Sequence, residues 1–240
     1  MRVVDGIVWN LSRLVVLPFL YLYPLRMRRR GVEHLPAHGP VLIVCNHVSV
    51  ADPIVLMAAA RKRRTSMVAK QELFERHPAF AWILRCLRAI PLDRSKPADF
   101  RCIRTACALL DEGQAVVVFP EGHVSRAGIM RRGAPGAGMF ALRPGVTVIP
   151  AVVWNTQLFR GPARVLFGPP VDVSGIDADS RHERNRLATD RIMRALAEML
   201  PRVGGPAQDP PVGAQRPIDR RRGIWFPPPE GEHEPERVAV

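Results

Sequence analysis

Short apolar runs alternate along the chain with segments in which apolar side chains recur at helical spacing. The runs have strand length and are rich in Val and Ile, and they cover residues 41–45, 65–69, 89–92, 115–119, 146–153 and 165–167. The segments at 54–60, 78–87, 99–110, 139–142 and 177–200 predict helices. Strands that alternate with helices in this way predict an α/β fold, with a mostly parallel sheet flanked by helices.

The amino-terminal end of the chain departs from this alternation. Residues 6–25 are mostly apolar, but Asn10, Arg13 and two prolines interrupt them, and the longest apolar stretch is too short to span a bilayer. No small-residue cleavage site follows, so we do not expect a signal peptide. Flanking aromatic residues and arginines favour a helix lying in a membrane interface; the alternative is an apolar helix packed on the domain's own core.

The carboxyl-terminal end departs from it as well. From residue 201 onward the chain is rich in Pro, Gly and charge and poor in aliphatic side chains, a composition that predicts disorder. We therefore expect three parts: a helical segment anchored at a membrane interface at 1–34, an α/β domain at 35–202, and a disordered Pro- and Arg-rich tail at 203–240.

The positive charge of the chain limits the classes of binding partner that we expect. The formal net charge is +13, and arginines cluster at Arg26 with 28–30, at 61–64 around Lys62, at 131–132 and at 220–222. Such clusters suit anionic phospholipid headgroups, nucleic acid or a phosphorylated cofactor. Nucleic acid is not expected as a partner, because no binding module is recognisable and aromatic residues make up only 6% of the chain. The four cysteines show no zinc-like spacing, so no metal site is predicted.

Candidate chemistry stands between the strand at 41–45 and the helix at 54–60. His47 can move a proton near neutral pH, and a nearby carboxylate can fix its tautomer. Asp52 lies five residues further on, too far to face His47 on a regular helix, so the turn would have to bring them together. Alternatively, Asp52 followed by Pro53 fits a helix N-cap with proline at the first helical position. This stretch alone leaves both interpretations open.

Polar residues also follow two other predicted strands, at the edge of the sheet where α/β proteins hold their ligands. An arginine at a strand end can hold a phosphate through two hydrogen bonds, and a glycine lets a ligand approach the backbone. For Arg94 the alternative is a surface ion pair with Asp93 or Asp99. The residues in question are Arg94 after the strand at 89–92, and Glu121, Gly122, Ser125 and Arg126 after the strand at 115–119.

Four motifs in order resemble the glycerolipid acyltransferase family, the PlsC-like lysophosphatidic acid acyltransferases, over roughly residues 35 to 170. They are Asn-His-four residues-Asp, an apolar run ending in Arg, Phe-Pro-Glu-Gly-Thr-Arg-Ser, and an apolar strand containing proline. The matching positions are Asn46, His47 and Asp52 with Ser49 also in its usual place; 90–94; 119–122 with Ser125; and 148–152. His123 and Val124 replace the usual threonine and arginine of the third motif, so acceptor binding would rely more on Arg94, Arg126 or Arg131.

The resemblance implies transfer of a fatty acyl group from acyl-CoA, or from acyl carrier protein, to the hydroxyl of a lysophospholipid such as 1-acylglycerol-3-phosphate. His47 would be the general base and Asp52 would orient its ring. The substrate-binding residues would be Asn46, Ser49, Arg94, Glu121, Gly122, Ser125 and Arg126, with no metal and no cofactor beyond the acyl donor. The expected location is the cytoplasmic face of the cell membrane, peripheral or monotopic, on an anionic phospholipid surface.

Three alternatives accompany this interpretation. The same His-Asp pair could activate water, which would make the protein an acyl-ester or thioester hydrolase. The acceptor could be another glycerolipid or a glycolipid. The third possibility is a non-catalytic membrane-binding module, whose sequence would be expected to have lost His47 or Asp52.

Overall fold

The computed structural model describes residues 27–61, 63–75, 78–86, 88–95, 99–125, 127–157 and 162–212. The helix expected at 6–25, Arg126 and the tail beyond residue 212 lie outside the described residues. Within the described part of the chain, no helix is both long enough and apolar enough to cross a membrane.

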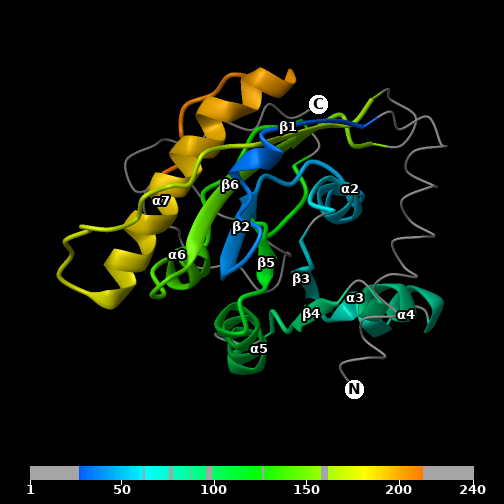
Figure 1. Ribbon diagram of the computed structural model, residues 1–240, viewed down its shortest axis with the longest axis horizontal. Coiled ribbons are helices and arrows are strands. Elements are labelled where there is room, and N and C mark those ends of the chain that lie inside the picture. The colour runs from blue at the N-terminus through cyan, green and yellow to red at the C-terminus, as the bar shows by residue number, and fades with distance from the viewer. Residues whose placement is uncertain are drawn as a thin grey trace, which may run out of the picture.

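Seven strands form one sheet in the order β1-β7-β6-β2-β5-β3-β4 (Figure 1). The strands β2 to β6 all run in the same direction, whereas β7 is antiparallel to β6, and β1 is parallel to β7. Their bounds are β1 (Arg28–Arg30), β2 (Val41–Cys45), β3 (Thr65–Lys70), β4 (Ala89–Leu92), β5 (Ala115–Val118), β6 (Thr147–Trp154) and β7 (Arg164–Phe167). The predicted α/β class with a mostly parallel, helix-flanked sheet is confirmed.

Helices cover both faces of this sheet. The helix α2 packs on one face, and α5, α6 and α7 pack on the other, as Figure 1 shows. The helices are α2 (Asp52–Ala59), α3 (Glu72–Glu75), α4 (Pro78–Cys86), α5 (Phe100–Asp111), α6 (Gly136–Ala141) and α7 (Arg181–Met199), with short 3-10 turns η1 (Val32–His34) and η2 (Leu200–Val203). The central position of β2 explains its unbroken apolar run, because alternate side chains enter the two separate cores.

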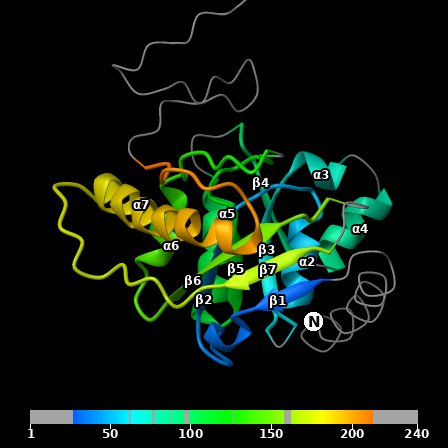
Figure 2. The ribbon, with the colours of Figure 1, turned by 90° about the horizontal axis from the view of Figure 1, so that it is seen from above.

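The sheet begins earlier in the chain than the sequence predicted. Residues 28–30 form β1, which lies beside β7 at one edge of the sheet (Figure 2), and Arg28 N–H donates to Ala163 O at 2.7 Å. A strand of three arginines thus joins the sheet ahead of residue 35, where the α/β domain was expected to begin. An edge strand exposes its side chains to water, so it lacks the apolar pattern by which the other strands were recognised.

The packed chain also continues past residue 202, where the tail was expected to begin. Val203 is buried in the core on the side of the sheet that α5, α6 and α7 cover. The side chain of Gln208 forms hydrogen bonds with the backbone of two residues in a loop. Its side-chain oxygen accepts from Met130 N–H at 2.8 Å, and its amide donates to Gly128 O at 3.1 Å. These contacts hold the segment up to Gln208 against the domain in a place where composition alone predicted disorder.

Candidate active site

His47 and Asp52 meet at the carboxyl end of β2. His47 Nδ1 lies 2.8 Å from Asp52 Oδ2, and the turn between β2 and α2 brings them together as the sequence required. The Asp52 side chain is fully buried, while 16% of the His47 side chain stays exposed. A buried carboxylate bonded to Nδ1 holds a proton on that nitrogen and leaves Nε2 as the atom of the ring that can accept a proton from a substrate.

Four hydrogen bonds hold the Asp52 carboxylate in place. Besides the imidazole, Oδ2 accepts from Val48 N–H at 2.6 Å and from Ser49 N–H at 2.8 Å. Oδ1 accepts from the hydroxyl of Thr156, which follows β6 and is fully buried. Hydrogen bonds of this kind stabilise the ionised carboxylate that an imidazole partner requires.

The helix-cap interpretation of Asp52 is wrong. Ala51 is the N-cap residue of α2, no side chain caps that helix, and Asp52 is already its first helical residue. The carboxylate is directed back to the N–H groups of the preceding turn, so it fixes the loop that carries His47 and leaves the first N–H groups of α2 uncapped by a side chain.

Glu121 anchors the backbone on either side of the site. Its side chain is 1% exposed; Oε1 accepts from His47 N–H at 3.1 Å and Oε2 accepts from Arg131 N–H at 3.0 Å. Burial raises the pKa of Glu121 from its ordinary value of 4.5 to about 7, against the lowering effect of these two hydrogen bonds. The Glu121 carboxylate thus joins the loops after β2 and β5, and both of its oxygens are engaged by backbone donors.

Three other predicted substrate-binding residues also direct their polar groups to the backbone. Asn46 is fully buried, and its side chain pairs with the backbone of β6 as a neighbouring strand would. Its amide donates to Val153 O at 3.1 Å, and its oxygen accepts from Val153 N–H at 2.8 Å. Ser49 Oγ accepts from Ala51 N–H at 3.2 Å. The Ser125 hydroxyl donates to a backbone carbonyl at 2.5 Å, and its N–H donates to His47 O at 2.6 Å.

Arg94 and Gly122 are brought together at the same edge of the sheet, from the ends of β4 and β5. Gly122 has a positive φ of 70°, and a Cβ at this position would lie 3.8 Å from Arg94 Nη2. Arg94 is half-buried, and that burial lowers the pKa of its guanidinium. Arg126, which was expected beside them, lies outside the described residues.

His123 adds a second imidazole to this edge. Its Nδ1 lies 2.9 Å from Glu121 O, so Nδ1 carries a proton. Burial lowers the pKa of His123, and the positive charges of Arg131, His47 and Arg94 lower it further, although the bond to Glu121 O opposes them. The His123 ring is therefore neutral near pH 7 and lies among cationic groups.

Two contacts of the His47–Asp52 pair were not predicted from the sequence: Phe119, known there only as part of a motif, and Thr156. The Phe119 ring stacks on the His47 ring, with centroids 4.4 Å apart and planes 27° apart, which limits rotation of the imidazole. Thr156 follows the carboxyl end of β6, so the rule that singled out the residues after the strands at 89–92 and 115–119 would have found it too. Among the described residues, no group of three or more His, Cys, Asp or Glu could hold a metal ion.

The fold and the site together define a class of protein: an α/β transferase or hydrolase with a His-Asp pair beside an arginine at the carboxyl edge of its sheet. The family model described as Acyltransferase matches residues 26–154. The chain belongs to the acyltransferase family, as the motifs had predicted.

Three relatives of known activity are similar to this chain over most of its length. The 1-acyl-sn-glycerol-3-phosphate acyltransferase alpha of Homo sapiens is 32% identical over 183 residues, which are 71% of this chain and 63% of that protein. A chloroplastic 1-acyl-sn-glycerol-3-phosphate acyltransferase of Arabidopsis thaliana is 27% identical over 180 residues, 70% of this chain and 50% of that protein. The enzyme of the same name from Bacillus subtilis is 27% identical over 176 residues, 70% of this chain and 84% of that protein. The chain thus spans about half to two thirds of the plant and human relatives.

A solved structure shares the fold. The crystal structure of the 1-acyl-sn-glycerophosphate acyltransferase PlsC from Thermotoga maritima matches with a TM-score of 0.58 at 24% identity. The match covers 82% of this chain and 79% of that one.

Proposed function

We propose that this protein transfers a fatty acyl group from the thioester of acyl-CoA, or of acyl carrier protein, to the free hydroxyl of a lysophospholipid. The acceptor that the relatives' names favour is 1-acylglycerol-3-phosphate. The observation that carries the proposal is the 2.8 Å contact between His47 Nδ1 and Asp52 Oδ2, next to an arginine at the end of β4. A base for a hydroxyl and a cation for a phosphate are the two groups that this acceptor requires.

His47 is the general base of the reaction. With Nδ1–H donated to Asp52, the lone pair on Nε2 takes the proton of the acceptor hydroxyl as that oxygen attacks the thioester carbonyl. The carbon–sulfur bond then breaks, the acyl group stays on the acceptor oxygen, and the thiolate of the donor takes the proton from His47 Nε2, which restores the base. Asp52 remains ionised throughout and stabilises the imidazolium that forms.

Arg94 binds the phosphate of the acceptor. It lies at the same edge of the sheet as His47, and the absence of a side chain at Gly122 keeps the space beside its guanidinium open. A planar guanidinium can hold two phosphate oxygens at once, which orients the headgroup as well as attracting it. His123 stands where a threonine is usual, and its ring is neutral, so Arg94 supplies the positive charge for the phosphate in this proposal.

Glu121, Thr156 and Asn46 are positioning residues in this proposal. Glu121 is buried against backbone N–H groups, which supports a role in holding the His47 loop rather than a contact with the acceptor. Thr156 holds Asp52 from the opposite side of the site. The precision of the base therefore depends on backbone contacts between β2, β5 and β6.

The acceptor is an amphiphile, so the enzyme works at an anionic membrane surface, which we place at the cytoplasmic face. The apolar segment at 6–25 and the arginines after it support this arrangement. Deletion of residues 1–26, which stops short of β1, is expected to release the protein from liposomes that contain anionic lipid. Sedimentation with such liposomes measures this, and undiminished binding of the shortened chain would contradict the anchoring role.

The central test is an acyl-transfer assay with labelled acyl-CoA, with and without 1-acylglycerol-3-phosphate. Wild-type protein should form labelled phosphatidic acid only when the acceptor is present. His47→Ala and Asp52→Asn should each lose about 10² to 10⁴ in rate, the range for general-base catalysis. Release of free fatty acid without acceptor would favour a hydrolase instead, and a fully active His47→Ala would refute the mechanism.

A further inference from the structure

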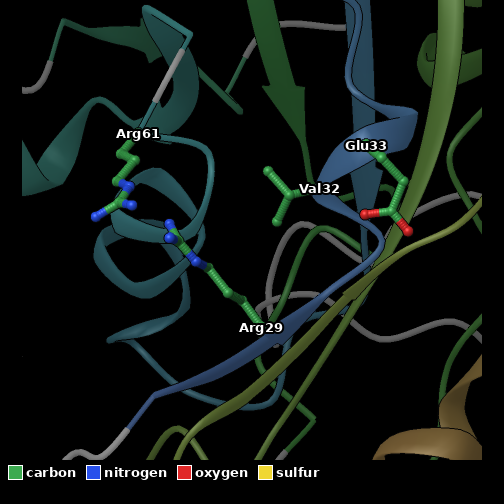
Figure 3. Close-up of a pocket in the computed structure, with 4 residues that line it drawn as sticks. All are labelled: Arg29, Val32, Glu33 and Arg61. Atoms are coloured by element: carbon green, nitrogen blue, oxygen red, sulfur yellow. The ribbon is translucent and has the colours of Figure 1, made fainter.

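A second cationic site lies away from the active site. The strand β1 and the turn η1 border it on one side, and the end of α2 borders it on the other. The cavity has a volume of about 350 Å³ and is lined by Arg29, Val32, Glu33 and Arg61 (Figure 3). Two arginine clusters that are far apart in the sequence, at 28–30 and 61–64, each contribute one side chain to it.

The helix α2 separates this cavity from His47. Asp52 in the active site is the first residue of α2, whereas Arg61 follows the last turn of that helix. Eight residues of α-helix rise roughly 12 Å, so the two ends of α2 serve different places. A ligand group held between Arg29 and Arg61 would therefore not be the phosphate that Arg94 holds beside His47.

The two guanidinium groups share the cavity without an acidic partner between them. Figure 3 shows them pointing toward one another, while the Glu33 carboxylate lies on the far side of Val32. Arg29 makes one long hydrogen bond of 3.5 Å, from Nη1 to Ala59 O. Among the described residues, no carboxylate forms an ion pair with Arg29 or Arg61. Two like charges that converge on a cavity repel one another, and an anion placed between them removes that cost.

The neighbouring Arg63, by contrast, is an arginine whose guanidinium stabilises the fold. Arg63 is 7% exposed and donates to Ala37 O, Gly39 O and Gly113 O at 2.7, 2.5 and 3.1 Å. It ties the loop before β3 to the loops before β2 and β5. Arg61 is exposed and has no comparable set of backbone acceptors, although it lies only two residues away.

We propose that Arg29 and Arg61 together bind a phosphate group in this cavity, as a site separate from the acceptor site. Guanidinium groups recognise phosphate through paired hydrogen bonds, and Val32 offers an apolar wall to the rest of the ligand. The phosphate belongs either to an anionic phospholipid headgroup or to a soluble phosphorylated compound. A cavity of this volume is at the small end of the range for ligand sites and suits a headgroup-sized molecule.

The test is a titration of the full chain with inorganic phosphate at constant ionic strength, followed by the backbone NMR signals of Arg29, Val32 and Arg61. These signals report on the cavity and not on phosphate bound near Arg94. In the variant R29Q/R61Q we expect the affinity at these signals to fall about tenfold or more, as expected for loss of charged hydrogen bonds.

The matched control is R30Q/R64Q, which removes the same charge from the same strand and the same loop. Both of its arginines are exposed and neither lines the cavity. It should bind phosphate like the wild type. Equal phosphate affinity in R29Q/R61Q and wild type would overturn the proposal. If R29Q/R61Q failed to fold, R61Q alone would carry the test, because the Arg61 side chain is exposed.

A vesicle arm identifies the source of the phosphate. Sedimentation with phosphatidylcholine vesicles, with or without phosphatidylglycerol, compares the same variants. A larger loss of binding to the anionic vesicles in R29Q/R61Q than in R30Q/R64Q assigns the site to a lipid headgroup, whereas equal vesicle binding by the two variants, with phosphate binding lost only in R29Q/R61Q, assigns it to a soluble ligand. Acyl transfer in detergent micelles should be equal in all variants, which separates this site from the reaction at His47.

Discussion

The buried carboxyl of Glu121 makes the stability of this protein depend on pH in a direction that can be tested. Its pKa is raised from 4.5 to about 7, chiefly by burial. The folded protein therefore binds this proton more tightly than the unfolded chain does. The stability that the protonated Glu121 carboxyl contributes is present in full below its pKa in the unfolded chain, and it is lost as the pH rises through 7, its pKa in the folded protein.

The size of the effect follows from the shift in pKa. Each unit corresponds to about 1.4 kcal/mol, so ionising Glu121 in the folded state costs up to about 3 kcal/mol. Glu121→Gln has no proton to lose in this range. It also keeps only one acceptor oxygen for the two N–H groups of His47 and Arg131, which changes its stability by an amount that does not vary with pH.

Urea unfolding between about pH 5 and pH 8, followed by tryptophan fluorescence, measures this difference. The free energy of unfolding of the wild type should fall relative to that of Glu121→Gln by up to about 3 kcal/mol over this range. Glu198→Gln, an exposed glutamate on α7, is the control and should follow the wild type. A difference between wild type and Glu121→Gln that stays constant with pH would refute the argument.

Three further predictions concern the site and its support. Asn46→Ala leaves a buried N–H and C=O of β6 unpaired, so urea unfolding should show a loss of about 2–4 kcal/mol. Thr156→Val should slow acyl transfer about tenfold, because Asp52 loses a hydrogen-bond donor that holds it in place; Thr156→Ser should restore the rate. Gly138→Ala should lower the melting temperature, because its Cβ would lie 1.9 Å from a carbonyl oxygen of α7, whereas Gly136→Ala meets nothing within 4 Å and should not. Thermal unfolding distinguishes these last two.

Most of the fold could be predicted from local patterns. The strands β2 and β5 are buried on both faces, so unbroken apolar runs revealed them, and helical spacing revealed α5 and α7. The strand β1 could not be found in this way, because its three arginines are an edge strand stabilised by backbone bonds to β7. The segment from Val203 to Gln208 escaped prediction for a related reason, since one glutamine side chain holds it through two backbone groups.

In the candidate site, too, the residues that are close in sequence could be predicted and those that are distant could not. Asn46, His47 and Asp52 are close in sequence, so their spacing was sufficient to predict that any contact between the imidazole and the carboxylate needs a turn between them. Their surroundings come from distant parts of the chain: Glu121 is 74 residues from His47, and Thr156 is 104 residues from Asp52. No local pattern could show whether these side chains face a substrate or the backbone.

The sequence by itself determined the alternation of the buried strands with helices and, through four short motifs, the family resemblance, because each strand, helix and motif is a pattern of residues that are neighbours along the chain. Only the tertiary structure decided that Glu121 and Asn46 bind backbone groups, and that Arg29 and Arg61 converge on one cavity. Parallel strands place their carboxyl ends at one edge, so residues far apart in sequence become neighbours there. Hydrogen bonding between those neighbours is a property of distances in space, which the spacing of residues along a chain does not contain.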